Sequence, residues 1–61
     1  MPISVKQART RREYSQKEIA EKLKIHRQTY IIWEKTPDKM SVGKAKEFCS
    51  IVNLSMNEID W

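Results

Sequence analysis

The 61-residue sequence has one glycine, two prolines, one cysteine and one histidine. Glycine and proline supply most of the tight turns that join β-strands into hairpins, so their scarcity leaves few positions for such turns. The sequence contains no internal repeat and no low-complexity stretch. We therefore expect an all-α fold.

The single cysteine, Cys49, excludes an internal disulfide framework. Cys49 and His26 together also fall short of the three or four ligands that a zinc site needs. No apolar run approaches the roughly 20 residues that cross a bilayer, and the first ten residues lack the apolar segment of a secretory signal. We expect a cytoplasmic protein with no metal, no other cofactor and no membrane partner.

The length predicts one small domain spanning residues 1–61. A chain this short buries only about 60% of the surface that its unfolded form exposes, which leaves little interior for a catalytic pocket. Cys49 and His26 are not a catalytic pair, because no third orienting group falls at a readable spacing. We predict that the protein is not an enzyme and that Cys49 belongs to the core.

Twelve lysines and arginines outnumber eight aspartates and glutamates, so the formal net charge is +4. A basic surface favours polyanionic partners such as nucleic acid. Charge alone does not identify the partner, because many small basic proteins bind no nucleic acid.

The apolar spacing predicts helices over about residues 4–12, 16–23 and 26–35. In the first helix, Val5, Ala8 and Arg9 share one side. Ser15 is a good N-cap for the second helix, and Glu18 three residues later completes the pattern of a capping box.

A fourth helix is expected after Pro37, with Ser41 as its N-cap and Asn53 closing it in a left-handed turn. The apolar positions of this helix are Val42, Ala45, Phe48, Cys49 and Val52. A fifth, short helix near the C-terminus would contain Leu54, Met56 and Ile59.

The stretch RQTYIIWEK, residues 27–35, includes three residues that favour strands. A strand would mix polar and apolar side chains on both of its faces. A helix instead separates them: one side carries Tyr30, Trp33 and Glu34, and the other carries Arg27, Gln28, Ile31 and Ile32. We expect a helix whose aromatic side faces the core, with two isoleucines on its outer side.

The segment from Tyr14 to Glu34 resembles the helix-turn-helix core of the phage repressor and Cro family, also called XRE-like regulators. The small residue Ala20 fits the point where two helices cross closely. The matching positions are Ser15, Gln16, Ile19, Ala20, Leu23, Ile25, Tyr30, Trp33 and Glu34. The resemblance covers almost the whole chain and implies a small five-helix lambda-repressor-like domain that regulates transcription, as a repressor or a Cro-like switch of a bacterium or its phage.

Two positions depart from the family pattern. Lys24 stands where the family prefers glycine in the turn, at a cost of about 1 kcal/mol if its backbone is left-handed. Thr36 stands where glycine usually ends the recognition helix.

The resemblance implies that residues 26–35 lie in the major groove of an operator in double-stranded DNA. Glutamine can pair with adenine, arginine with guanine, and an aliphatic side chain can meet a thymine methyl group. We therefore expect Arg27, Gln28 and Ile32 to read bases. The alternatives are a solvated helix face for Arg27 and Gln28, and a subunit or domain contact for the isoleucines.

Four further residues are candidates for phosphate contacts, which set register and carry no sequence information. Gln16 opens the second helix, whose free N–H groups suit a phosphate oxygen, and the resemblance implies that its amide braces the recognition helix. Lys35 and Lys39 flank the following loop, and His26 stands at the N-cap position. Each of the four could instead be an ordinary solvated polar residue.

The resemblance also implies an ion pair between Arg9 and Glu34 that locks the first helix to the third.

One recognition helix covers too few base pairs to single out a site in a genome, so we expect a homodimer, with assembly on the operator itself left open. The candidate dimer surface carries Met40, Met56 and Trp61, although Trp61 could instead pack on its own domain. A runner-up function is a protein-interaction module, such as an antitoxin or anti-repressor that binds through Ile31, Ile32 and Trp61.

Overall fold

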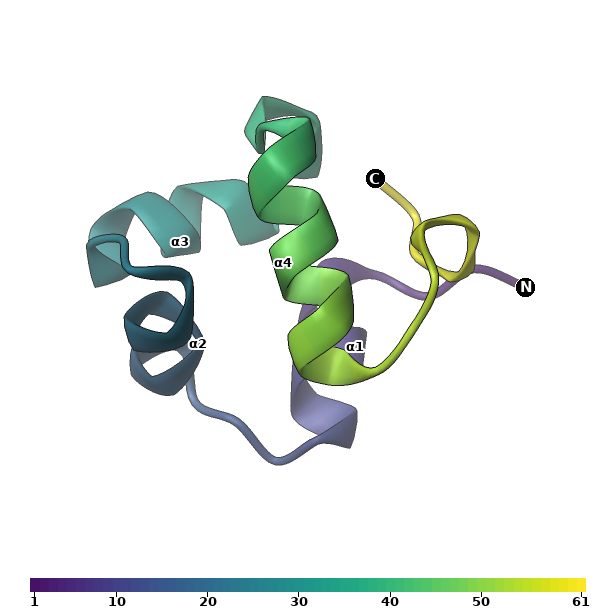
Figure 1. Cartoon of the computed structure of the whole chain (residues 1–61), viewed down its shortest axis with the longest axis horizontal. Helices are drawn as coiled ribbons and strands as arrows, with labels where there is room; N and C mark the ends of the chain where they lie inside the picture. Colours follow the sequence, from purple (N-terminus) through teal and green to yellow (C-terminus); the bar gives the residue numbers. More distant parts are fainter.

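The computed structural model describes residues 1–61 and contains four α-helices, two single 3-10 turns and no sheet (Figure 1). In chain order the elements are α1 (Val5–Arg11), α2 (Gln16–Leu23), α3 (Arg27–Lys35), η1 (Pro37–Lys39), α4 (Val42–Val52) and η2 (Met56–Glu58). The all-α prediction is confirmed. None of these helices is both long and apolar enough to span a lipid bilayer.

The expected count of five helices was one too high. The last segment forms only the 3-10 turn η2, because the chain becomes extended at Ile59 and pairs there with the N-terminal segment.

Serine side chains fix the starts of three helices. Ser4 and Ser15 each accept a hydrogen bond from the backbone three residues ahead and form a complete capping box. Ser41 accepts a bond of 3.3 Å from the backbone N–H of Lys44. The N-cap of α3, His26, makes no such side-chain bond, so the first N–H groups of α3 have no side-chain cap.

One hydrophobic cluster lies between α1, α2, α3 and α4, and its largest fully buried side chains include Tyr30 and Phe48. The cluster consists of Val5, Ala8, Ile19, Ala20, Leu23, Tyr30, Met40, Ala45, Phe48, Cys49, Val52 and Ile59. Figure 1 shows α2 and α3 together on one side, with α4 running past them toward α1.

Val42, the first of the expected apolar positions of α4, is not part of the core, since this residue is 66% exposed. Val42 is the first residue of α4 and borders an open hollow instead of the core. The buried stripe begins one turn later, at Ala45.

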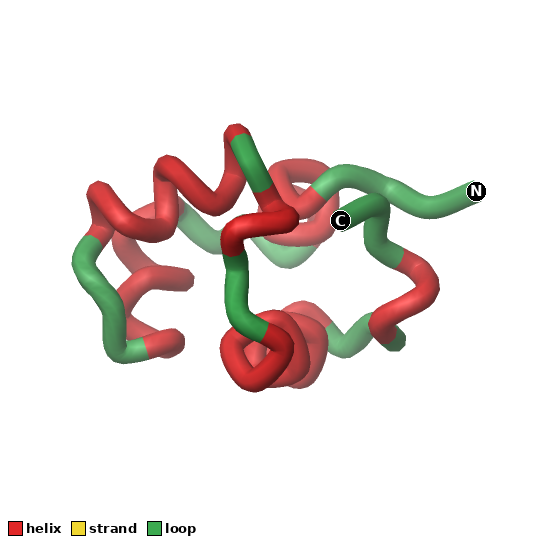
Figure 2. Tube along the Cα trace, turned by 90° about the horizontal axis from the view of Figure 1, so that it is seen from above, coloured by secondary structure: helices red, strands yellow, loops and turns green.

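The two chain ends are tied together by a short parallel bridge between Ile3 and Ile59. The N–H of Ile3 donates to the carbonyl of Glu58 at 3.1 Å, and the N–H of Asp60 donates to the carbonyl of Ile3 at 2.7 Å. Both views place the ends on the same side of the molecule, away from α2 (Figure 1 and Figure 2). This pairing was not predicted from the sequence.

Three non-glycine residues have left-handed backbones: Glu13, Lys24 and Asn53. Asn53 ends α4 as predicted. Lys24 ends α2 with φ 59° and ψ 44°, and the next N–H, that of Ile25, donates to the carbonyl of Ala20 at 3.0 Å. The turn between α2 and α3 therefore has the geometry that usually selects glycine, although a lysine occupies it.

We expect Lys24→Gly to raise the free energy of unfolding by up to about 1 kcal/mol, because glycine adopts the left-handed backbone without steric cost. Denaturant unfolding measures the change. Lys46→Gly, at an exposed position inside α4, is the matched control and should lower stability by about 1 kcal/mol. Equal losses in both variants would contradict the assignment of strain to Lys24.

Candidate nucleic-acid interface

Helix α3 has one buried and one exposed side. Tyr30 is fully buried and stacks on Phe48 with ring centroids 6.4 Å apart, and Trp33 is half-buried against the core. On the other side, Arg27 and Gln28 are exposed. The outward placement of these polar side chains agrees with the helical pattern of the sequence.

An open hollow of about 520 Å³ lies between the N-terminal parts of α2 and α3. It is lined by Lys17, His26, Arg27, Gln28 and Ile31. No carboxylate lines this hollow, while Lys17 and Arg27 each bring a positive charge. The surface around the start of α3 is thus suited to a polyanion.

Lys17 was missed by the sequence interpretation. It follows Gln16 in the first turn of α2 and is exposed beside the start of α3. Its position one residue after a phosphate candidate was the signal that could have identified it.

The structure brings Arg9 and Glu34 together as a buried ion pair. Nε of Arg9 donates to Oε2 of Glu34, and the two side chains are only 10% and 7% exposed. Nη1 of Arg9 also donates to the backbone carbonyl of Tyr14 at 2.8 Å. Nε2 of Gln16 donates to Oε1 of Glu34 at 3.1 Å. Side chains from α1 and α2 therefore converge on one carboxylate of α3.

The environment of Glu34 favours its charged form. Burial alone would raise the pKa of Glu34. The hydrogen bonds that Glu34 accepts, above all from Arg9, and the positive charge of Arg9 outweigh this effect, so the pKa is lowered. The buried Tyr30 hydroxyl adjoins the pair. The pKa of Tyr30 is raised, mainly by burial and to a smaller extent by the neighbouring Glu34 carboxylate. The pair is thus ionised at neutral pH while Tyr30 stays neutral.

The remaining phosphate candidates lie around the exposed side of α3. His26 is exposed at the N-cap, Lys35 is exposed at the last residue of α3, and Lys39 is exposed at the end of η1. Neither lysine takes part in an ion pair within the chain. Gln16 is half-buried, and its amide nitrogen is held by Glu34, which leaves its amide oxygen without a hydrogen bond.

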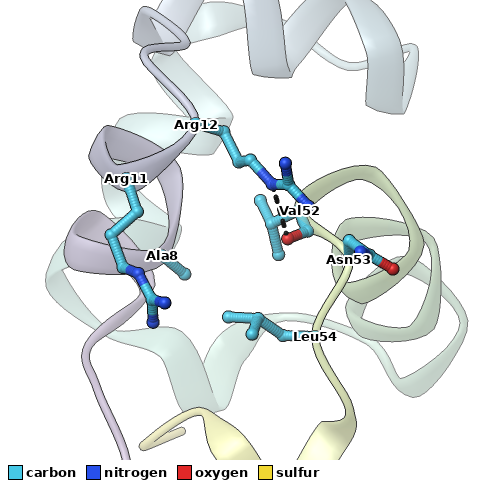
Figure 3. A pocket seen from close by; sticks show the side chains of 6 residues that line it. All are labelled: Ala8, Arg11, Arg12, Val52, Asn53 and Leu54. Carbon is cyan, nitrogen blue, oxygen red and sulfur yellow. Dashed lines mark hydrogen bonds between the residues drawn. The ribbon is translucent and has the colours of Figure 1, made fainter.

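A second hollow, of about 290 Å³, lies where the ends of α1 and α4 meet (Figure 3). Nε of Arg12 donates there to the carbonyl of Val52, the last residue of α4, at 3.1 Å. Such a bond satisfies a helix-end carbonyl that has no partner inside the helix. Arg12 therefore has a structural role in this hollow.

The chain contains no group of three histidine, cysteine or acidic side chains placed to hold a metal ion. Cys49 is buried in the core, as predicted, and burial raises the pKa of its thiol.

A family model described as helix-turn-helix matches residues 5–59, from the start of α1 to the C-terminal bridge. The chain belongs to the helix-turn-helix family. The assignment to XRE-like, Cro-type regulators is thereby confirmed. No similar protein with a curated description and no similar solved structure was found.

Members of this helix-turn-helix family are DNA-binding regulators. In the geometry described above, α2 and α3 form the helix-turn-helix, Lys24 lies in its turn, and α3 occupies the place of the recognition helix.

We expect Glu34→Ala to destabilise this helix-turn-helix domain by about 3–5 kcal/mol, because it leaves the buried Arg9 charge unpaired. A loss of this size is comparable with the whole stability of a domain this small. Thermal melts of Glu34→Ala and of Arg9→Met/Glu34→Ala provide the measurement. The double variant should recover part of the loss; if the single variant melts like the wild type, the pair does not stabilise the fold.

Proposed function

We propose that this protein is a transcriptional repressor or Cro-like switch that inserts α3 into the major groove of a DNA operator. The observation that carries the proposal is the outward projection of Arg27 and Gln28 from a helix whose opposite side is fixed by the core and the Glu34 pair. Rigid placement of a helix is what the reading of base edges requires.

The base-reading set is Arg27, Gln28 and Ile32. Gln28 can donate to and accept from an adenine edge, while Arg27 can donate two bonds to guanine. Ile32, one helical turn after Gln28, adds an exposed apolar surface for a neighbouring base.

We assign phosphate contacts to Lys35 and Lys39 after the recognition helix, and to Gln16 and His26 at the starts of α2 and α3. The amide nitrogen of Gln16 uses one of its two N–H groups on Glu34, so the other can donate to a phosphate beside the free backbone N–H groups at the start of α2. Lys17 joins this set because it lines the same hollow as His26 and Arg27.

A gel-shift titration over a range of salt concentrations separates this function from a protein-interaction module. DNA binding should weaken steeply as salt rises, since bound lysines and arginines displace counterions from the phosphates. Selection of a site from a random DNA pool then supplies the operator. Absence of salt-dependent DNA binding would favour the interaction module.

Gln28→Ala should cost about 1–3 kcal/mol of binding free energy at the selected site, because it removes two hydrogen bonds to one base. Affinity for unrelated DNA should hardly change. Fluorescence anisotropy with both DNAs gives the two values. Ser50→Ala, at an exposed position of α4, is the control and should leave both unchanged. A parallel fall on both DNAs would show that Gln28 does not read a base.

Neutralising Lys39 or Lys35 with glutamine should weaken binding to all sequences alike. Each change should lower the steepness of log K against log salt by about one unit, since one phosphate contact releases about 0.9 of a counterion. Lys46→Gln, on the exposed side of α4, removes the same charge outside the proposed interface. A slope equal to that of the wild type would remove the lysine concerned from the phosphate set.

We further propose that the protein binds its operator as a two-fold dimer. Two structural findings correct the expected dimer surface. Met40 is only 8% exposed and belongs to the core. Trp61 is half-buried against Phe48, with ring centroids 6.2 Å apart, and its Nε1 donates to the carbonyl of Met56 at 2.8 Å.

The exposed part of this surface is centred on Val42 and Met56, which are 66% and 36% exposed. They border an apolar hollow of about 210 Å³ that Pro37 and Trp61 also line. A self-complementary contact between two such surfaces would give the dimer the two-fold symmetry that a palindromic operator requires.

We expect the operator to be a palindrome with half-site centres about 34 Å apart, or 10 to 10.5 base pairs. Inserting five base pairs between the half-sites should abolish cooperative binding, because it turns one half-site to the opposite face of the duplex. Val42→Asp should weaken cooperativity without unfolding the domain, since Val42 is exposed. Gel shifts on full and half sites measure both effects. Equal affinity for a lone half-site and a full palindrome would refute the dimer.

A further inference from the structure

Two isoleucines adjoin the proposed base-reading residues on the exposed side of α3. Ile32 is 53% exposed, and Ile31 is half-buried and lines the hollow beside Arg27 and Gln28. Together the pair forms what we call the isoleucine ledge, Ile31 and Ile32.

The fold does not account for Ile32. A β-branched side chain loses rotamer freedom in a helix, and an exposed one gains little from burial in return. Ile32 contributes nothing to the buried cluster, whereas its neighbour Trp33 packs against that cluster. An exposed apolar side chain on a basic helix face calls for an apolar group on the partner.

The position of the isoleucine ledge relative to Gln28 restricts which part of the DNA it can contact. Ile31 and Ile32 follow Gln28 by three and four residues, so both lie one turn along α3 on the same side. With the Gln28 amide at one base edge, the ledge would face a base of the same or the next pair.

Only one apolar group is offered by the bases in the major groove of ordinary DNA, the C5-methyl group of thymine. A cytosine methylated at C5 presents a methyl group at the corresponding place. Uracil and unmodified cytosine present a hydrogen atom there.

On the basis of the DNA binding proposed above, we infer that Ile32, supported by Ile31, reads the C5-methyl group of a pyrimidine. The contact buries the methyl group against Ile32 while Gln28 pairs with an adenine edge. Because thymine and 5-methylcytosine share this group, the affinity of the protein for a site that places cytosine opposite Ile32 responds to methylation of that cytosine.

The test starts from the operator selected in the random pool. Each thymine is replaced in turn by uracil, which removes only the methyl group. At one position in each half-site, affinity should fall about fourfold, the equivalent of about 0.8 kcal/mol for one buried carbon. At that position the T·A pair is then exchanged for C·G, with and without a C5-methyl group. The methylated form should bind about fourfold more tightly.

The protein arm of the experiment uses Ile32→Ala. This variant should melt like the wild type, because Ile32 lies outside the core, and should bind thymine and uracil sites equally. Ser50→Ala, at an exposed position of α4 outside both proposed binding surfaces, should keep the full discrimination. Gln28→Ala should bind more weakly and still distinguish thymine from uracil.

The possible outcomes are distinguishable. A response to both methylated pyrimidines supports the inference, and a response to thymine alone would overturn the predicted sensitivity to cytosine methylation. Selective binding that depends on Gln28 but not on any methyl group would overturn the inference and leave the proposed function intact. Discrimination that survives Ile32→Ala would also overturn it. If the wild-type protein shows no sequence-selective DNA binding at all, the proposed function itself would be refuted.

Discussion

The fold depends most on the buried carboxylate of Glu34 and the groups that surround it. A charge in this position must be compensated, since burying it alone costs several kcal/mol. Arg9 supplies the opposite charge from α1, and Gln16 supplies a hydrogen bond from α2. The carboxylate itself belongs to α3. The orientation of the recognition helix is thus fixed by an electrostatic requirement as well as by packing of Tyr30 on the core.

Features that depend on neighbouring residues in the chain could be predicted from the sequence. The capping boxes at Ser4 and Ser15, the left-handed end at Asn53 and the two sides of α3 all follow from spacings of three or four residues. The exposed placement of the candidate base readers was predicted for the same reason, because the sides of a helix follow directly from its period. The pairing of Arg9 with Glu34, 25 residues apart, came only through the family resemblance.

Features that depend on distant parts of the chain could not be predicted. Val42 continues the apolar period of α4, yet burial requires a neighbour, and only an open hollow lies beside it. Met40 precedes that helix among polar residues and is nevertheless buried. The bridge between Ile3 and Ile59 joins residues from opposite ends of the sequence, so no local sequence pattern predicts it. The same bridge ends the chain in an extended segment where a fifth helix was expected.

The terminal bridge has a consequence for protein engineering. Both ends of the chain leave the molecule from one side, while the N-terminal turn of α3 lies on the other side (Figure 1). A fluorescent reporter fused to either end would therefore emerge away from the proposed DNA-binding surface. A flexible peptide joining the C-terminus of one copy to the N-terminus of a second has the same advantage, so a single-chain tandem protein is accessible without rebuilding the helices.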